Sequence, residues 1–81
     1  EGLRMKIFPN PVTDQLTIEW EGVDAAEIKW TIFNTAGLTV KTGFSVQKGR
    51  FDINVSELKT GPYIIKLDTD DRTIKKRFIV Q

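Results

Sequence analysis

Few side chains in this chain could carry out catalytic chemistry. The 81 residues include neither histidine nor cysteine. Ser45 and Ser56 therefore have no imidazole to take up a hydroxyl proton, and no thiolate is available as a nucleophile or zinc ligand. We predict that the domain is not an enzyme and uses no cofactor.

Two other groups of side chains have a pattern that binds ligands in some proteins. Asp68, Asp70 and Asp71 offer the oxygen ligands that calcium prefers, but their spacing fits no twelve-residue loop and no glycine lies among them. We expect a solvated hairpin tip here and predict no metal site. Asn54-Val55-Ser56 matches the glycosylation sequon at a strand end, which is a weak signal.

Trp20 and Trp30 could together form a platform on which a sugar ring stacks. Each tryptophan, however, follows the inward alternation of its own strand. We expect both side chains to pack in the core, and exposure of both would favour a carbohydrate-binding module instead.

The charges exclude several further classes of function. Twelve basic and eleven acidic residues are interspersed and give a net charge of +1, whereas a nucleic-acid surface needs clustered positive charge. No apolar run approaches the roughly 18 residues of a membrane-spanning helix. No secretory signal pattern follows Glu1, so we expect residues 1–81 to be one domain taken from a longer protein.

Alternation of apolar and polar residues, interrupted by turn signals every 8–12 residues, predicts an all-β domain. β-Branched and aromatic residues dominate the alternating runs. The pattern favours an immunoglobulin-like Greek-key β-sandwich of about seven antiparallel strands, with one buried and one wet face per sheet. The predicted strands cover residues 4–8, 15–21, 27–34, 38–43, 51–55, 62–69 and 73–80.

The same alternation predicts which side chains point inward. It places Leu38 and Val40 on the buried face of the fourth strand. In the last strand it places Lys76 on the side of Phe78 and Val80, whereas Lys75 and Arg77 share the side of Ile79. The sequence thus predicts one lysine on an otherwise apolar inner face.

The connections contain residues with characteristic turn chemistry. We expect Pro9-Asn10-Pro11 to form a rigid turn rather than a contact site, and Asp14 to hydrogen-bond local backbone. Gly37 and Gly49 can adopt the positive φ that short hairpin loops require. Residues 24–26 could form a single helical turn.

The stretch Leu58-Lys59-Thr60-Gly61-Pro62-Tyr63 resembles the tyrosine corner of immunoglobulin-like domains. In that motif a tyrosine hydroxyl bonds back to upstream backbone. The alternative is a half-buried strand tyrosine with a solvated hydroxyl.

Four blocks resemble, in order, the C-terminal sorting domain of proteins exported by the bacterial type IX secretion system. They span residues 8–18, 32–40, 53–63 and 75–81, and the third contains a pattern like the family's L-x-x-G-x-Y. Phe8 stands where tyrosine is common, and Gln81 where lysine is common. The motif residues are Pro9, Asn10, Pro11, Asp14, Gly37, Leu58, Gly61 and Tyr63.

The resemblance implies a secretion signal attached to an N-terminal cargo domain. Such a domain passes through the periplasm, is recognised by the type IX translocon, and directs the cargo to the cell surface or the medium. A surface sortase-like peptidase then typically removes it. The alternatives are a structural or adhesive fibronectin- or immunoglobulin-like module, or a carbohydrate-binding module, of a secreted protein.

Exposed edge strands suggest how partners could bind, by strand addition to an open sheet. Lysines on an edge strand can equally serve to block aggregation, and an open edge also permits homodimerisation. The resemblance favours the last strand as the surface that the translocon recognises. The candidate residues are Lys75, Lys76, Arg77, Phe78, Ile79, Val80 and Gln81.

Overall fold

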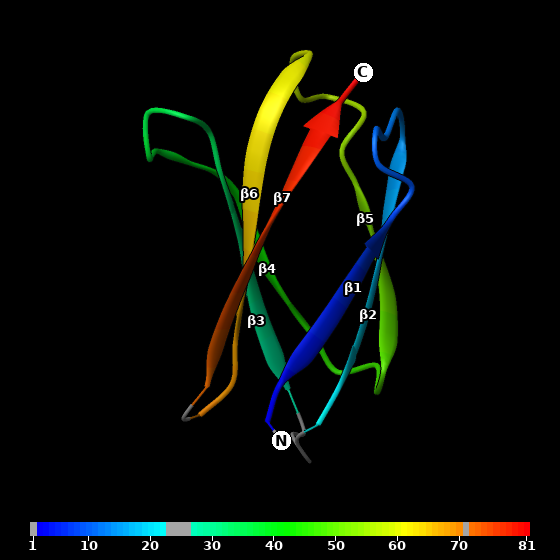
Figure 1. Ribbon diagram of the computed structural model, residues 1–81, viewed down its shortest axis with the longest axis vertical. Helices are drawn as coiled ribbons and strands as arrows, with labels where there is room; N and C mark the ends of the chain where they lie inside the picture. The colour runs from blue at the N-terminus through cyan, green and yellow to red at the C-terminus, as the bar shows by residue number, and fades with distance from the viewer. Residues whose placement is uncertain (1, 23–26, 71) are drawn as a thin grey trace.

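The computed structural model describes residues 2–22, 27–70 and 72–81, and in these residues all regular structure is β-strand. They form seven strands, which lie in two layers (Figure 1). Their bounds are β1 Arg4–Phe8, β2 Gln15–Glu21, β3 Ile28–Phe33, β4 Thr39–Ser45, β5 Arg50–Asn54, β6 Gly61–Asp68 and β7 Thr73–Val80. The bounds predicted for β1, β2 and β7 are confirmed, and the others differ by one or two residues.

The strands form a three-stranded sheet in the order β1-β2-β5 and a four-stranded sheet in the order β4-β3-β6-β7. All neighbouring strands are antiparallel. The chain crosses between the sheets after β2, β4 and β5, which agrees with the predicted Greek-key, immunoglobulin-like sandwich. The described residues include no helix with the length and apolar character needed to cross a membrane.

The core lies between the two sheets because apolar side chains alternate inward along most strands. Phe78, Leu16 and Ile18 are among its largest fully buried side chains. The buried apolar residues are Met5, Val12, Leu16, Ile18, Trp20, Ile28, Ile32, Phe51, Ile53, Val55, Tyr63, Ile65, Leu67, Phe78 and Val80. Six of the seven strands contribute to this cluster.

The exception is β4, where the inward prediction for Leu38 and Val40 is wrong. Leu38 is 64% exposed and Val40 is 38% exposed. Leu38 lies in the loop before β4, and a register shift leaves Val40 without a partner, because Ile32 pairs with Lys41 and Phe33 with Thr39. β4 is also the outermost strand of the wider sheet, and none of its residues is buried.

Trp30 is half-buried and packs against the core from β3, so its predicted burial is only partial. Gly43 lies opposite it on β4, and a Cβ at Gly43 would come within 2.7 Å of the Trp30 ring. The glycine therefore makes room for the indole. Trp20 is buried, as predicted.

The predicted loop glycines adopt positive φ, at 83° for Gly37 and 81° for Gly49. Asn34 organises the loop that contains Gly37. Its Oδ1 accepts hydrogen bonds from the backbone N–H groups of Ala36 and Leu38, both at 3.0 Å. The helical turn predicted for residues 24–26 lies outside the described residues.

Candidate functional site

The turn between β1 and β2 docks onto the end of β7. Val12 forms a parallel bridge with Val80, its N–H donates to the Ile79 carbonyl at 2.8 Å, and its carbonyl accepts from the Gln81 N–H at 2.8 Å. Asn10 Oδ1 accepts from the Ile79 N–H at 2.9 Å. We call these bonds among Asn10, Val12, Ile79 and Gln81 the clasp.

The clasp changes the interpretation of Pro9-Asn10-Pro11. The segment is a turn, as predicted, and both of its prolines follow cis peptide bonds. It also makes an intramolecular contact that the sequence reasoning missed. No local signal could have revealed that contact, because its two halves lie at opposite ends of the chain.

The clasp covers only the last part of the outer edge of β7. Backbone N–H and C=O groups of alternate strand residues point to the same edge. Because the backbone of Ile79 faces the clasp, that of Lys75 and Arg77 faces the same way, away from β6. Among the described residues no strand pairs with this stretch of edge, which runs from residue 73 to residue 77.

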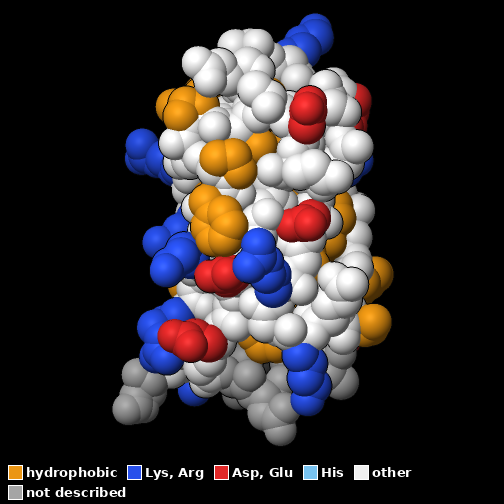
Figure 2. Space-filling model, turned by 90° about the vertical axis from the view of Figure 1, so that its right-hand side faces the viewer, with side chains coloured by type: hydrophobic (Ala, Val, Ile, Leu, Met, Phe, Trp, Pro, Cys, Tyr) orange, Lys and Arg blue, Asp and Glu red, His pale blue; other side chains and the backbone are white. Residues whose placement is uncertain are grey.

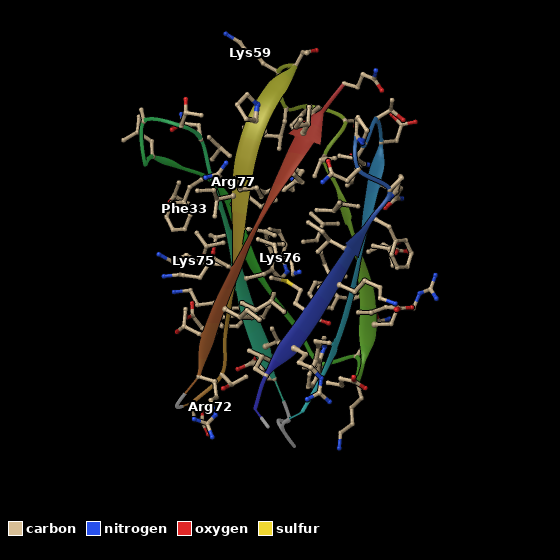
Figure 3. The ribbon with its side chains drawn as sticks, viewed as in Figure 1. Phe33, Lys59, Arg72, Lys75, Lys76 and Arg77 are labelled. Atoms are coloured by element: carbon tan, nitrogen blue, oxygen red, sulfur yellow. The ribbon has the colours of Figure 1, made fainter. Side chains whose placement is uncertain are left out.

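Side chains of three neighbouring strands form a basic and apolar surface next to this edge. Phe33 of β3 pairs with Ile64 of β6, and Ile64 pairs with Arg77 of β7. In Figure 3, Phe33, Lys75 and Arg77 lie on the outer side of the four-stranded sheet. Phe33, Ile64, Lys75 and Arg77 line an open groove of about 590 Å³. With Ile79, which is 48% exposed, they make up what we call the β7 outer surface.

The positive charge of this surface is not neutralised internally. Within the part of the chain that the structure describes, the side chains of Lys75 and Arg77 form no ion pair and no hydrogen bond. Lys75 lies opposite Lys66, and like charges opposite each other across strands repel. Lys66 has partners of its own, Asp68 at 3.6 Å and the Phe33 ring, whose centre lies 5.5 Å from the Lys66 ammonium, whereas Lys75 and Arg77 stay uncompensated within the described residues. The surface therefore attracts anionic groups.

The outer face of the three-stranded sheet differs in this respect. Figure 2 shows that face with basic and acidic side chains intermixed. Arg4 pairs with Glu21 at 3.1 Å and Arg50 with Glu19 at 3.2 Å. The Arg50 guanidinium also lies 5.6 Å from the centre of the Phe8 ring. These cations already have partners, so this face offers less to an acidic ligand.

The seven candidate residues of the last strand separate into two groups. Phe78 and Val80 are 1% and 2% exposed, so their side chains belong to the core and are unavailable to a partner of the folded domain. Lys76 is exposed and lies on the side of β7 that faces the other sheet (Figure 3). The predicted alternation along β7 is thus confirmed.

Tyr63 forms the predicted tyrosine corner. Its hydroxyl donates to the Lys59 carbonyl at 2.7 Å, so the alternative of a solvated hydroxyl is wrong. The Tyr63 ring also stacks on Phe78, with ring centres 5.8 Å apart. The corner therefore ties the turn before β6 to β7. In the same turn, the Leu58 N–H donates a hydrogen bond to the Val55 carbonyl at 3.0 Å.

The structure corrects one further expectation, that the Asp14 side chain hydrogen-bonds local backbone. Among the described residues its carboxylate has no hydrogen-bond partner. Its backbone carbonyl instead accepts from the Val55 N–H at 2.8 Å. Asp14 thus fixes the start of β2 against the end of β5 through its main chain.

Of the other polar groups considered as ligand sites, Asp68 and Asn54 have structural partners, and Asp71 lies outside the described residues. Asp68 accepts from the Thr73 hydroxyl at 2.7 Å across the last hairpin. Asn54 Oδ1 accepts from the Ser56 N–H at 2.9 Å and hydroxyl at 2.7 Å. Trp20 is buried and Trp30 half-buried, which does not fit an exposed pair of rings for sugar stacking.

The pKa of the Glu57 carboxyl group is shifted by a hydrogen-bonded ion pair. Lys41 Nζ donates to Glu57 Oε2 at 2.6 Å. This hydrogen bond, followed by one from backbone, lowers the pKa of Glu57 from its ordinary value of 4.5. The pair joins the outermost strand β4 to the turn after β5.

Comparison with known proteins identifies the family of this chain. The family model described as "Secretion system C-terminal sorting domain" matches residues 6–81. No curated protein matches the chain. The match includes both halves of the clasp, the tyrosine corner and the β7 outer surface. The chain therefore belongs to the family of secretion system C-terminal sorting domains, and it is a type IX sorting signal that directs an N-terminal cargo across the outer membrane to the cell surface or beyond.

Proposed function

We propose that the type IX machinery recognises this domain through the β7 outer surface and the adjoining free edge of residues 73–77. One observation carries the proposal: among residues 2–22, 27–70 and 72–81, Lys75 and Arg77 have no ionic partner, and they lie beside the exposed side chain of Ile79. Like charges opposite each other across strands, as for Lys75 and Lys66, are unfavourable, and exposed apolar side chains rimmed by polar residues are typical of interaction sites. Of the candidate residues, Lys75, Arg77 and Ile79 contribute to this surface.

The chemistry of the surface specifies the kind of partner. An extended segment can add to the free edge of β7, where backbone hydrogen bonds give affinity and alternate side chains give specificity. Carboxylates of that segment would meet Lys75 and Arg77, the latter with bidentate geometry. Its apolar side chains would contact Ile64 and Ile79. The partner we propose is therefore an acidic, partly apolar strand of the translocation machinery.

Protection against aggregation is the competing role for basic residues on an edge strand. Lys76 is suited to that role, because it places a charge on the inner side of β7, where an uncontrolled strand pairing would bury it. Lys75 and Arg77 point to the opposite face. We propose that protection and recognition are divided between these two sides of the same strand.

The sites of recognition and of cargo attachment are separate in this scheme. β1 begins at the opposite end of the sandwich from the end of β7 (Figure 1). A cargo on the N-terminal side would leave the β7 outer surface uncovered. We propose that the folded domain passes through the periplasm in this form, and that a surface peptidase afterwards cuts on the N-terminal side of the domain. The family resemblance supports both steps, and the N-terminal sequence and mass of the exported cargo test the cut.

An export assay with charge-reversed variants tests the recognition surface. A reporter is joined to the N-terminal side of this chain and expressed in a bacterium with a working type IX system. The test variant is Lys75→Glu/Arg77→Glu. The control is Lys59→Glu/Arg72→Glu, which makes the same change in net charge at two exposed positions at the ends of the molecule (Figure 3). Thermal unfolding of each purified domain shows whether the variants fold.

We expect the test variant to accumulate in the periplasm and the control to be secreted like the wild type. Lys75→Arg/Arg77→Lys, which keeps both charges, should retain most of the secretion. Equal secretion of the folded test variant and the control would rule out this surface as the recognition site.

A further inference from the structure

The edge of the four-stranded sheet opposite β7 carries a row of exposed apolar side chains. On and beside β4, Leu38, Val40, Phe44 and Val46 are 64%, 38%, 63% and 71% exposed. Lys41 is the one charged residue of β4, and its ammonium is held by Glu57 at 2.6 Å. The row is therefore apolar without an opposing charge, unlike the β7 outer surface.

The outward backbone of β4 is available for strand pairing. The Trp30 carbonyl faces β4, since it accepts the Thr42 hydroxyl at 2.9 Å, and Gly43 lies directly opposite Trp30. Alternation along the strand then directs the backbone groups of Gly43 to β3 and those of Thr42 and Phe44 to the open edge.

The other sheet edges of the described structure carry charges that oppose pairing. An edge strand that lacks such charges is a template for another strand. The charged residues on the other three edge strands are Arg4 and Lys6 on β1, Arg50 and Asp52 on β5, and Lys75, Lys76 and Arg77 on β7. In addition, the clasp covers the end of β7.

We propose that β4 pairs antiparallel with β4 of a second copy of this chain, about a two-fold axis at Thr42. In this register Thr42 faces its own equivalent, and Val40 faces Phe44 of the second copy. Leu38 and Val46 lie just beyond the two ends of β4 and add exposed apolar surface beside the paired strands. The two exposed apolar residues of β4 itself thus meet each other across the contact, and this pair occurs twice because of the symmetry.

The register also avoids repulsion between charges. Lys41 lies opposite Gly43 of the second copy, so the two ammonium groups are kept apart and each keeps its Glu57 partner. A strand whose sequence is complementary to itself in this way forms a closed, isologous contact that does not propagate into fibres.

The dimer would leave the opposite edge of the sheet free. β4 and β7 are the two outer strands of one sheet, so pairing through β4 gives a continuous eight-stranded sheet with β7 at both ends. The inference does not rest on the proposed recognition surface, and both copies of that surface would remain accessible.

Sedimentation equilibrium of the 81-residue chain over a range of concentrations tests whether the dimer forms. Phe44→Lys places a cation opposite Val40 of the second copy, and we expect it to raise the dimer dissociation constant about tenfold or more. The matched control is Gln15→Lys, which adds the same charge at an exposed position of β2. That control should leave the dissociation constant unchanged.

Disulfide trapping tests the register. No native thiol can compete with the introduced one, because the chain has no cysteine of its own. Thr42→Cys puts a thiol next to its symmetry mate, and mild oxidation should give a covalent dimer. Phe44→Cys is the control on the same strand. Its two thiols would be displaced by four residues, about 13 Å along the strand, which is too far for a disulfide.

A concentration-dependent dimer that is weakened by Phe44→Lys and trapped by Thr42→Cys alone would establish the proposal. A chain that stays monomeric up to millimolar concentration would overturn it. A dimer that is indifferent to Phe44→Lys, or that is trapped equally well through Phe44→Cys, would overturn it too, because the contact would then lie elsewhere.

Discussion

Asn10 Oδ1 accepts a hydrogen bond from the backbone N–H of Ile79 at 2.9 Å, although the two residues are 69 positions apart in the sequence. This hydrogen bond joins the Pro9-Asn10-Pro11 turn near the start of the matched range to the last strand near its end. The Pro-Asn-Pro turn therefore does more than reverse the chain. It supplies an acceptor to the outer edge of β7 and leaves the preceding stretch of that edge open.

Asn10→Ala should destabilise the folded domain by about 1 kcal/mol, because the Ile79 N–H loses its acceptor. Urea unfolding, followed by the fluorescence of the buried Trp20, measures the change. Gln15→Ala is the control, since the Gln15 side chain has no hydrogen bond within the described residues and should change stability little. Equal stability of the two variants would mean that water replaces the Asn10 acceptor without cost.

Deletion of residues 75–81 should abolish cooperative folding. The deletion removes Phe78 and Val80 from the core, together with the whole β7 side of the clasp. Losing one large buried side chain alone typically costs about 3–5 kcal/mol, which is comparable to the stability of a small domain. Circular dichroism during heating provides the measurement. A sharp unfolding transition in the truncated chain would contradict this account of the core.

Tyr63→Phe should lower stability by about 1 kcal/mol, because the Lys59 carbonyl loses its hydroxyl donor while the ring stays packed. Urea unfolding measures the loss. The variant should still be exported, because the hydroxyl faces the turn before β6. A loss of export at unchanged stability would instead place the Tyr63 hydroxyl in the recognition surface.

Gly43→Ala should destabilise the domain by about 1–3 kcal/mol, because the new methyl group would overlap the Trp30 ring. The same change in a Trp30→Val background should cost much less. A double-mutant cycle of unfolding free energies isolates this coupling between facing residues. Additive effects of the two substitutions would show that Gly43 is required for another reason.

The ion pair between Glu57 and Lys41 should make stability depend on pH in acid. The pKa of Glu57 is lower in the folded state, so the pair stabilises the fold above about pH 4.5, and this contribution is lost as the pH falls through the lowered value. The difference between the unfolding free energies of wild type and Glu57→Gln should therefore be largest at pH 7 and should shrink as the pH is lowered below 4.5. Lys41→Met should behave in the same way. A difference that is constant with pH would exclude the pair as its source.

Alternation along each strand was enough to predict most of the fold. It gave seven strands, and it correctly assigned Lys75 and Arg77 to one face of β7 and Phe78 and Val80 to the other. It failed for Leu38 and Val40, because a local pattern does not reveal whether another sheet covers an edge strand. The register shift between β3 and β4 is equally invisible in the sequence of either strand alone.

The candidate site was predictable only in part, for a related reason. The local sequence marks a basic and apolar strand, but the surface also needs Phe33 and Ile64 from neighbouring strands. The contact of Asn10 with Ile79 depends on how the two sheets come together. The Tyr63 corner, by contrast, was predictable because donor and acceptor lie four residues apart.

The clasp also has a consequence for the order in which the polypeptide is made. Residues 79–81 leave the ribosome 67 or more positions after Val12, which at about 5–20 residues per second is a delay of roughly 3–13 s. During that interval Asn10 and Val12 have no β7 backbone to which they can hydrogen-bond. The sorting domain can complete its fold only after β7 has been translated. A polypeptide that terminates before β7 would therefore lack a folded export signal.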